Sequence, residues 1–223
     1  MKILAPLLYL IAAIGCLIGR LLENPLSTQL DYIFKPLLMP LLALIVLTSP
    51  NKTYPNKLLL LFALLFAWGG DMALMLGRDG LLFLAGLGSF LVMQILYIIL
   101  FRKDWERPSF LKKKPYWMLP FLVVGASFYL LSIPKLTEKP LMLIAVFVYA
   151  VALVSMSLSA LNRKGTVAWN KVLIGAILFL ISDLMIGASK FILDDFPYSG
   201  FAIMITYISG QYLIVSGLLK NKA

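Results

Sequence analysis

Two aspartates lie inside apolar segments that are long enough to cross a lipid bilayer. Asp71 follows the run Leu64–Gly70, and Asp183 follows the run Leu178–Ser182. A charged Asp at the centre of a bilayer costs about 2.5–3.5 kcal/mol on insertion scales, so acids that stay there mostly have a function. We therefore take Asp71 and Asp183 as candidate catalytic residues. The alternative is that each Asp is a neutral strut that hydrogen-bonds between helices.

The two aspartates are expected at similar depth in the membrane. Asp71 lies 14 residues after Lys57, and Asp183 lies 12 residues after Lys171. At a helical rise of 1.5 Å per residue they are roughly 21 and 18 Å from the basic ends of their helices. Two carboxylates at one level, on helices that run in the same direction, can line one cavity. Burial and a second carboxylate both disfavour the charged form, so we expect one protonated acid beside one ionised acid, which suits general acid–base chemistry.

Two lysines near these segments are candidate substrate-binding residues. Lys35 lies a few residues inside the second apolar segment, where it either pairs with an Asp or an anionic head group or snorkels to the outer interface. Lys190 lies seven residues beyond Asp183 on the same helical face. It either holds a phosphate at the outer mouth of the cavity or snorkels as well.

Polar side chains within the other apolar segments are candidate substrate-binding residues too. Ser182 allows a close approach of helices and can donate a hydrogen bond to a neighbouring carboxylate, and Gly69 and Gly70 allow the same close approach. Four further residues form two pairs with helical spacing, so each pair faces one way: Gln94 with Tyr97, and Tyr207 with Gln211. Hydrogen bonds between helices are the common alternative explanation for such residues.

The composition predicts an all-α integral membrane protein. Of 223 residues, 61% are hydrophobic and 13% are charged, and the mean hydropathy is +0.95. The apolar residues fall in blocks of about 20, the length of a membrane-spanning helix, without the alternation of a membrane β-barrel. We expect one transmembrane domain over residues 1–223, with Pro134 ending the fifth of eight spans. The spans are expected at about residues 3–22, 32–48, 57–76, 81–101, 116–133, 141–161, 171–193 and 200–219.

Several kinds of site are excluded by composition. The chain has no His, which removes His-based triads and His zinc motifs, and its one cysteine, Cys16, forms no intrachain disulfide. We therefore expect no metal and no cofactor. The net charge of +10 comes from basic residues between the apolar blocks, so membrane orientation explains it better than nucleic-acid binding. Fourteen of the 20 Lys and Arg residues fall on the side of the two termini, which the positive-inside rule places in the cytoplasm.

The two halves of the chain are weakly alike. Asn56-Lys57 opens the third span and Asn170-Lys171 opens the seventh, and each is followed by an apolar run with an Asp. The next helix in each half holds an internal Gln, and the two aspartates are 112 residues apart. These features suggest a 4+4 repeat of parallel halves. The alternative is the ordinary similarity of Leu-rich membrane helices.

Taken together, the motifs resemble those of the lysoplasmalogenase family, the YhhN-like and transmembrane-86 group. The resemblance covers nearly the whole chain and rests on the order and spacing of several short motifs. These are Lys35-Pro36 with Pro40, Gly70-Asp71, Phe83-x-x-Gly86-x-x-x-Phe90 leading to Tyr97, Gly175-Ala176-x-Leu178-Phe179-x-x-Ser182-Asp183, Lys190-Phe191, Pro197-Tyr198-Ser199, and Tyr207-x-x-x-Gln211-x-Leu213-Ile214.

The resemblance implies an eight-span protein, here of a bacterial inner membrane, that binds lysophospholipids among membrane lipids. Its implied activity is hydrolysis of the vinyl ether bond of lysoplasmalogen to a fatty aldehyde and a glycerophospho-base. Asp71 and Asp183 match the proposed catalytic pair of the family. One departure is Gln94, because the family usually has a His three residues before the Tyr at this point, and Gln cannot shuttle a proton.

Vinyl ether hydrolysis fits a pair of carboxyl groups. One acid protonates the alkene carbon, and the other stabilises the oxocarbenium ion and activates water. Ile181 and Leu184 make the surroundings of Asp183 more apolar than Gly70 makes those of Asp71, which favours Asp183 as the acid. Two other classes of function stay open. One is a small transporter with acids at the midplane, and the other is a non-catalytic lipid-binding protein.

Overall fold

The computed structural model describes residues 3–22, 25–49, 56–77, 79–103, 109–193 and 197–220. Within this part of the chain all regular secondary structure is helical, and eight helices are long and apolar enough to cross a membrane, which confirms the predicted fold class. The eight are α1 (Leu4–Leu21), α2 (Pro25–Thr48), α3 (Lys57–Leu76), α4 (Gly80–Lys103), α6 (Leu119–Leu136), α7 (Pro140–Leu161), α8 (Trp169–Phe191) and α9 (Ser199–Leu218).

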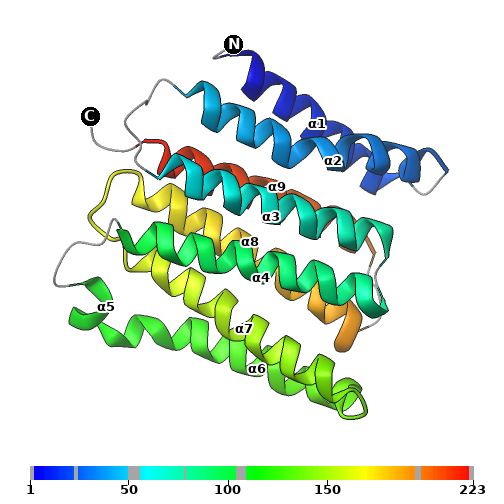
Figure 1. Ribbon diagram of the computed structural model, residues 1–223. Helices are drawn as coiled ribbons and strands as arrows, with labels where there is room; N and C mark the ends of the chain where they lie inside the picture. The colour runs from blue at the N-terminus through cyan, green and yellow to red at the C-terminus, as the bar shows by residue number, and fades with distance from the viewer. Residues whose placement is uncertain are drawn as a thin grey trace.

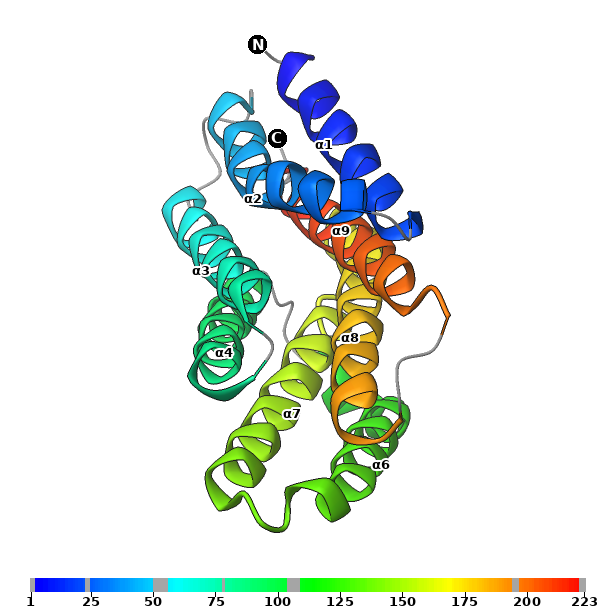
Figure 2. The ribbon, with the colours of Figure 1, turned by 90° about the vertical axis from the view of Figure 1, so that its right-hand side faces the viewer.

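Seven of these helices form a closed ring of neighbours. Along the ring α1 packs on α2, α2 on α3, α3 on α4, α4 on α7, α7 on α8 and α8 on α9, and α9 returns to α1 and α2. Figure 2 shows α3 and α4 on one side of the bundle and α8 and α9 on the other. Helix α6 stands outside the ring, against α7 and α8 (Figure 1). The ring therefore brings the two helices that carry the aspartates to face each other.

The side of the membrane on which the termini lie stays a prediction. Five of the basic residues that enter the count lie outside the described residues: Lys2, Lys52, Arg78, Arg107 and Lys222.

Helix α2 begins at Pro25, earlier than the predicted start near residue 32. Hydropathy assigns the polar residues Ser27, Thr28 and Asp31 to a loop. In the folded chain the Arg20 guanidinium of α1 pairs with Asp31, Nη2 to Oδ2 2.6 Å, so the first turns of α2 are helical and packed against α1. Lys35 therefore lies ten residues into its helix rather than three, which carries it away from the interface.

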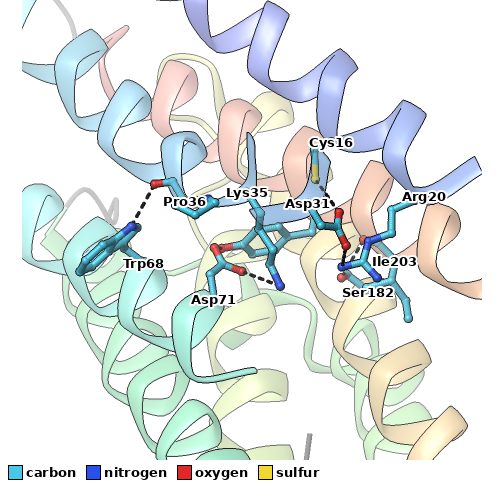
Figure 3. A network of polar contacts seen from close by, with 10 residues as sticks. Cys16, Arg20, Asp31, Lys35, Pro36, Trp68, Asp71, Ser182 and Ile203 are labelled. Carbon is cyan, nitrogen blue, oxygen red and sulfur yellow. Dashed lines mark hydrogen bonds and ion pairs between the residues drawn. The ribbon is translucent and has the colours of Figure 1, made fainter. Parts of the chain in front are cut away.

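The prolines inside α2 free a backbone carbonyl that a tryptophan then binds. Pro40 has no N–H, so the carbonyl of Pro36 lacks its helical partner. Trp68 of α3 donates its Nε1–H to this oxygen over 3.0 Å (Figure 3). An unpaired carbonyl in hydrocarbon is costly, so this bond makes the Pro-containing helix compatible with a membrane.

The prediction that Pro134 ends the fifth span is wrong. Helix α6 follows a four-residue helix, α5 (Phe110–Lys113), and a 3₁₀ turn, η1 (Pro115–Met118), and it runs through Pro134 to Leu136. A proline removes only its own N–H and need not stop the last turn. Thr137 donates its hydroxyl to the carbonyls of Ile133 and Pro134, over 3.2 and 3.1 Å, and so satisfies the end of the helix.

Small residues allow the closest helix contacts. A Cβ atom on Gly175 of α8 would lie 2.7 Å from the carbonyl oxygen of Gly210 of α9, so the two backbones are nearly in contact. A Cβ on Gly70 of α3 would meet the Phe90 ring of α4 at 2.6 Å, and one on Gly69 would meet the Ser89 hydroxyl at 2.8 Å. The predicted close approach at Gly69 and Gly70 is thereby confirmed.

Candidate active site

Both aspartates line one cavity inside the ring of helices. Asp71 reaches it from α3 and Asp183 from α8, on opposite sides. The cavity has a volume of about 210 Å³. The arrangement agrees with the depth estimated from helical rise. The residues that line the cavity are Arg20, Lys35, Asp71, Leu74, Phe83, Phe90, Ser182, Asp183, Ile186, Ser189, Lys190, Gly200, Ile203, Met204 and Tyr207.

Asp71 is buried between a lysine and a tyrosine. Its side chain accepts a hydrogen bond from the Tyr207 hydroxyl, which lies 2.6 Å from Oδ2. The Lys35 ammonium lies 3.8 Å from Oδ1, and Lys35 and Asp71 are 7% and 3% exposed. Figure 3 shows Lys35 pointing from α2 towards Asp71. Of the two interpretations of Lys35, pairing with an aspartate is therefore right and snorkelling is wrong.

Asp183 is bound by neutral donors. The Tyr149 hydroxyl of α7 and the Gln94 side-chain amide of α4 both donate to its Oδ2, the latter over 3.4 Å. No ion pair involves Asp183 within the described part of the chain. Ser182 does not donate to a carboxylate, so that expectation is wrong. Its hydroxyl bonds to the carbonyl of Ile203 over 3.1 Å and ties α8 to α9 (Figure 3).

Three of the predicted substrate-binding residues do not line the cavity. Gln94, Tyr97 and Gln211 are fully buried behind it. Tyr97 donates to the Gln211 Oε1 over 2.6 Å, and Gln211 donates to the sulfur of Met93 over 3.2 Å. Hydrogen bonds of these residues link α4 to α8 and to α9. This agrees with the alternative explanation that such polar residues form hydrogen bonds between helices.

The end of the cavity away from the termini is cationic. Lys190 lines it, with its ammonium 2.6 Å from Asp79 Oδ1 and 4.4 Å from the centre of the Phe83 ring. The hydrogen bond and the charge of Lys190 hold the pKa of Asp79 below its ordinary value. Asp79 itself is 94% exposed, so this end of the cavity is the mouth. Arg20 and Lys35 line the cavity as well, so the site has three basic side chains together with Lys190.

Two of these residues, Arg20 and Tyr149, were missed by sequence reasoning. Arg20 lies near the end of the first predicted span and was counted only as a charge on the outer side. Tyr149 lies in the middle of an apolar segment, the same signal that singled out Tyr97. Its spacing of 114 residues from Lys35 also matches the offset between the two halves of the chain.

The polar contacts of the two halves correspond to one another. Four residues of the first half have partners in the second at offsets of 112 to 114 residues. Each aspartate is bound by a residue from the second helix of its own half and by one from the fourth helix of the other half. This exchange agrees with a repeat of four helices. The corresponding pairs are Lys35 and Tyr149, Asp71 and Asp183, Gln94 and Tyr207, and Tyr97 and Gln211.

Comparison with known protein families identifies the family of this protein. The sequence profile of the YhhN family matches residues 30–218, which include both aspartates and all helices from α3 onwards. The chain belongs to the YhhN family. It is also similar to the lysoplasmalogenase TMEM86A of Bos taurus, with 28% identity over 174 residues that cover 76% of this chain and 69% of the relative. No solved structure matches the chain.

This member of the YhhN family is a multi-pass integral membrane protein whose cavity combines two acids with three bases. The described residues contain no group of three or more His, Cys, Asp and Glu side chains that could hold a metal ion. The side chains lining the cavity that can exchange protons with a bound molecule are carboxyl, phenol and ammonium groups. Such a set can protonate a substrate and stabilise the cation that forms.

Proposed function

We propose that this protein hydrolyses the vinyl ether bond of lysoplasmalogen-type lysophospholipids to a fatty aldehyde and a glycerophospho-base. The observation that carries the proposal is the position of Asp71 and Asp183 in one buried cavity with three basic side chains. The name of the bovine relative, a lysoplasmalogenase, supports the same activity.

The two carboxyl groups have different partners and therefore take different roles. The Lys35 ammonium 3.8 Å from Asp71 matches a negative charge, so we assign Asp71 as the anion. Asp183 has neutral partners, so we assign it as the proton donor. Asp183 protonates the second carbon of the alkenyl group, and the carbon bonded to oxygen becomes an oxocarbenium ion. Asp71 stabilises this cation and takes a proton from the water that attacks it. The hemiacetal hydroxyl then gives its proton to the Asp183 carboxylate, and Asp71 returns its proton to the glycerol oxygen. The bond between carbon and the glycerol oxygen breaks, the aldehyde carbonyl forms, the glycerol part leaves as an alcohol, and both acids regain their starting states.

The side-chain amide of Gln94 can hydrogen-bond to Asp183 whether Asp183 is ionised or protonated. In the structure its Nε2 donates to Asp183, while its Oε1 is buried and has no hydrogen-bond partner among the described residues. Rotating the amide by half a turn exchanges the two atoms. The amide then accepts a hydrogen bond from the protonated acid. Gln94 therefore does not need to shuttle a proton to replace a His.

The basic side chains of the cavity suit the head-group phosphate. Lys190 and Arg20 lie towards the mouth and are each held by an acid, Asp79 and Asp31. A phosphate that enters can take the place of these carboxylates. Lys35 is deeper and stays with Asp71. We infer a bacterial cell membrane and cytoplasmic termini, in which case the mouth opens to the outer side.

The test is the release of aldehyde by purified protein in detergent micelles, followed by mass spectrometry. Asp71→Asn and Asp183→Asn are each expected to lower turnover by about 100-fold or more, the contribution of a general acid or base. Glu138→Gln, in the exposed turn after α6, removes a carboxylate that does not line the cavity and should leave turnover unchanged. Turnover near the wild-type value in either Asp variant would overturn the assignment. Uptake of lysolipid into proteoliposomes without any aldehyde would favour a transporter instead.

A further inference from the structure

A second cavity, almost entirely apolar, adjoins the first at Asp183. It lies between α4, α6, α7 and α8 and has a volume of about 40 Å³. Tyr149 and Asp183 are the polar residues among its lining side chains. The two cavities have Leu74, Phe83, Phe90, Asp183 and Ile186 in common. Asp183 therefore stands where a cationic cavity meets an apolar one.

We propose that the apolar cavity binds the carbons of the alkenyl chain next to the scissile bond, and that Ala150, Phe128 and Gly187 determine which chains fit. This inference rests on the proposed function. A phosphate belongs with the three basic side chains of the first cavity, because a charge in an apolar cavity is costly. The chain must then leave the reacting carbons in the opposite direction, past Asp183 into the apolar cavity.

The size of the cavity limits what it can hold. A cavity of about 40 Å³ is small and holds only a few carbons of a lipid chain. The remainder of a long chain must extend beyond it. Selection therefore acts on the shape of the chain near the reacting bond and only weakly on its total length.

Helix α6 lies outside the ring of seven helices and forms the outer wall of this cavity. A Cβ atom on Gly187 of α8 would clash with the Phe128 ring of α6. A Cβ on Gly125 of α6 would lie 2.5 Å from the Cγ2 of Val154 of α7. These glycines let α6 pack closely on both neighbours and place the Phe128 ring at the cavity.

The shape of the alkenyl chain must decide whether it fits, because the chain passes from the apolar interior of the membrane into an equally apolar cavity. A lipid tail is as apolar as the cavity wall, so burial alone gives little driving force. Bulk added to the wall should therefore reject substrate, and a wider wall should admit branched chains. An alkyl ether lysolipid has no double bond to protonate, so it binds without reaction and measures fit separately from chemistry.

The experiment fills the cavity from α7 and uses the next residue as a control. Ala150 lines the cavity and is 8% exposed, whereas Val151 is 50% exposed and does not line it. Ala150→Leu should raise the KM for a straight-chain choline lysoplasmalogen about tenfold or more, with a smaller change in kcat, because overpacking is costly. It should weaken binding of the 1-O-hexadecyl alkyl ether lysolipid, measured by native mass spectrometry, by a similar factor. Val151→Leu should change neither value.

A second variant widens the cavity without adding bulk. Phe128→Leu should raise kcat/KM for a lysoplasmalogen with a methyl branch on the third carbon of the chain relative to the straight chain. Equal effects of Ala150→Leu and Val151→Leu, or an unchanged preference in Phe128→Leu, would overturn the inference. If the wild type released no aldehyde from any substrate, the proposed function would fail. The inference about the apolar cavity would then be tested by binding alone. Weaker binding of the alkyl ether in Ala150→Leu than in Val151→Leu would support it, and equal binding in the two variants would overturn it.

Discussion

The buried pair of Lys35 and Asp71 gives a quantitative test of the site. Two unit charges 3.8 Å apart attract by about 4 kcal/mol at an effective dielectric constant of about 20. Removing one partner of a buried pair costs about 3–5 kcal/mol, because the other charge is left without compensation. Tyr207 still donates to Asp71 after the lysine is removed, which offsets part of the loss. We therefore expect Lys35→Met to lower the free energy of unfolding by about 3 kcal/mol.

A double-mutant cycle isolates this interaction from other effects of each change. The four proteins are the wild type, Lys35→Met, Asp71→Asn and the double variant, unfolded reversibly by SDS in mixed micelles. We expect a coupling free energy of about 2–4 kcal/mol, so that the double variant is much more stable than the sum of the single changes predicts. Asn at residue 71 can still accept the Tyr207 hydrogen bond, which keeps the double variant folded.

The control cycle makes the same two changes at the mouth of the cavity. Lys190→Met and Asp79→Asn also remove a lysine and an aspartate in contact, but Asp79 is 94% exposed and its charge is screened by water. These two changes should be nearly additive. A coupling below about 0.5 kcal/mol between residues 35 and 71, within the error of additivity, would refute a charged buried pair.

Two further predictions concern helix packing. Gly175→Ala should lower the free energy of unfolding by about 1–3 kcal/mol, because its Cβ would lie 2.7 Å from a backbone oxygen of α9. Gly88→Ala, with no atom within 4 Å of the added Cβ, should not destabilise and serves as the matched control in the same SDS titration. Trp68→Phe should cost about 1 kcal/mol, since it leaves the carbonyl of Pro36 without its donor. An unchanged unfolding midpoint in Trp68→Phe would show that this bond contributes no stability.

The separation of the two acids into different environments could be predicted only in part. The apolar neighbours Ile181 and Leu184 favoured Asp183 as the acid, which agrees with the neutral partners that the fold gives it. The decisive contact is Lys35 beside Asp71. Sequence reasoning left it open because a loop was assigned where α2 begins. Hydropathy does not register an ion pair such as Arg20 with Asp31, which lets polar turns join a membrane helix.

The sequence by itself predicted eight apolar segments long enough to cross a membrane as helices, with two acids expected at similar depth. Backbone groups in hydrocarbon must be satisfied within each segment, so long apolar runs become helices, and a fixed rise per residue then gives the depth of Asp71 and Asp183. Only the tertiary structure decided which side chains meet them. Lipid and protein core are both apolar, so apolar residues surround each helix and do not mark its inward face. The rotation and packing of the helices brought Lys35 and Tyr207 to Asp71, and Tyr149 and Gln94 to Asp183.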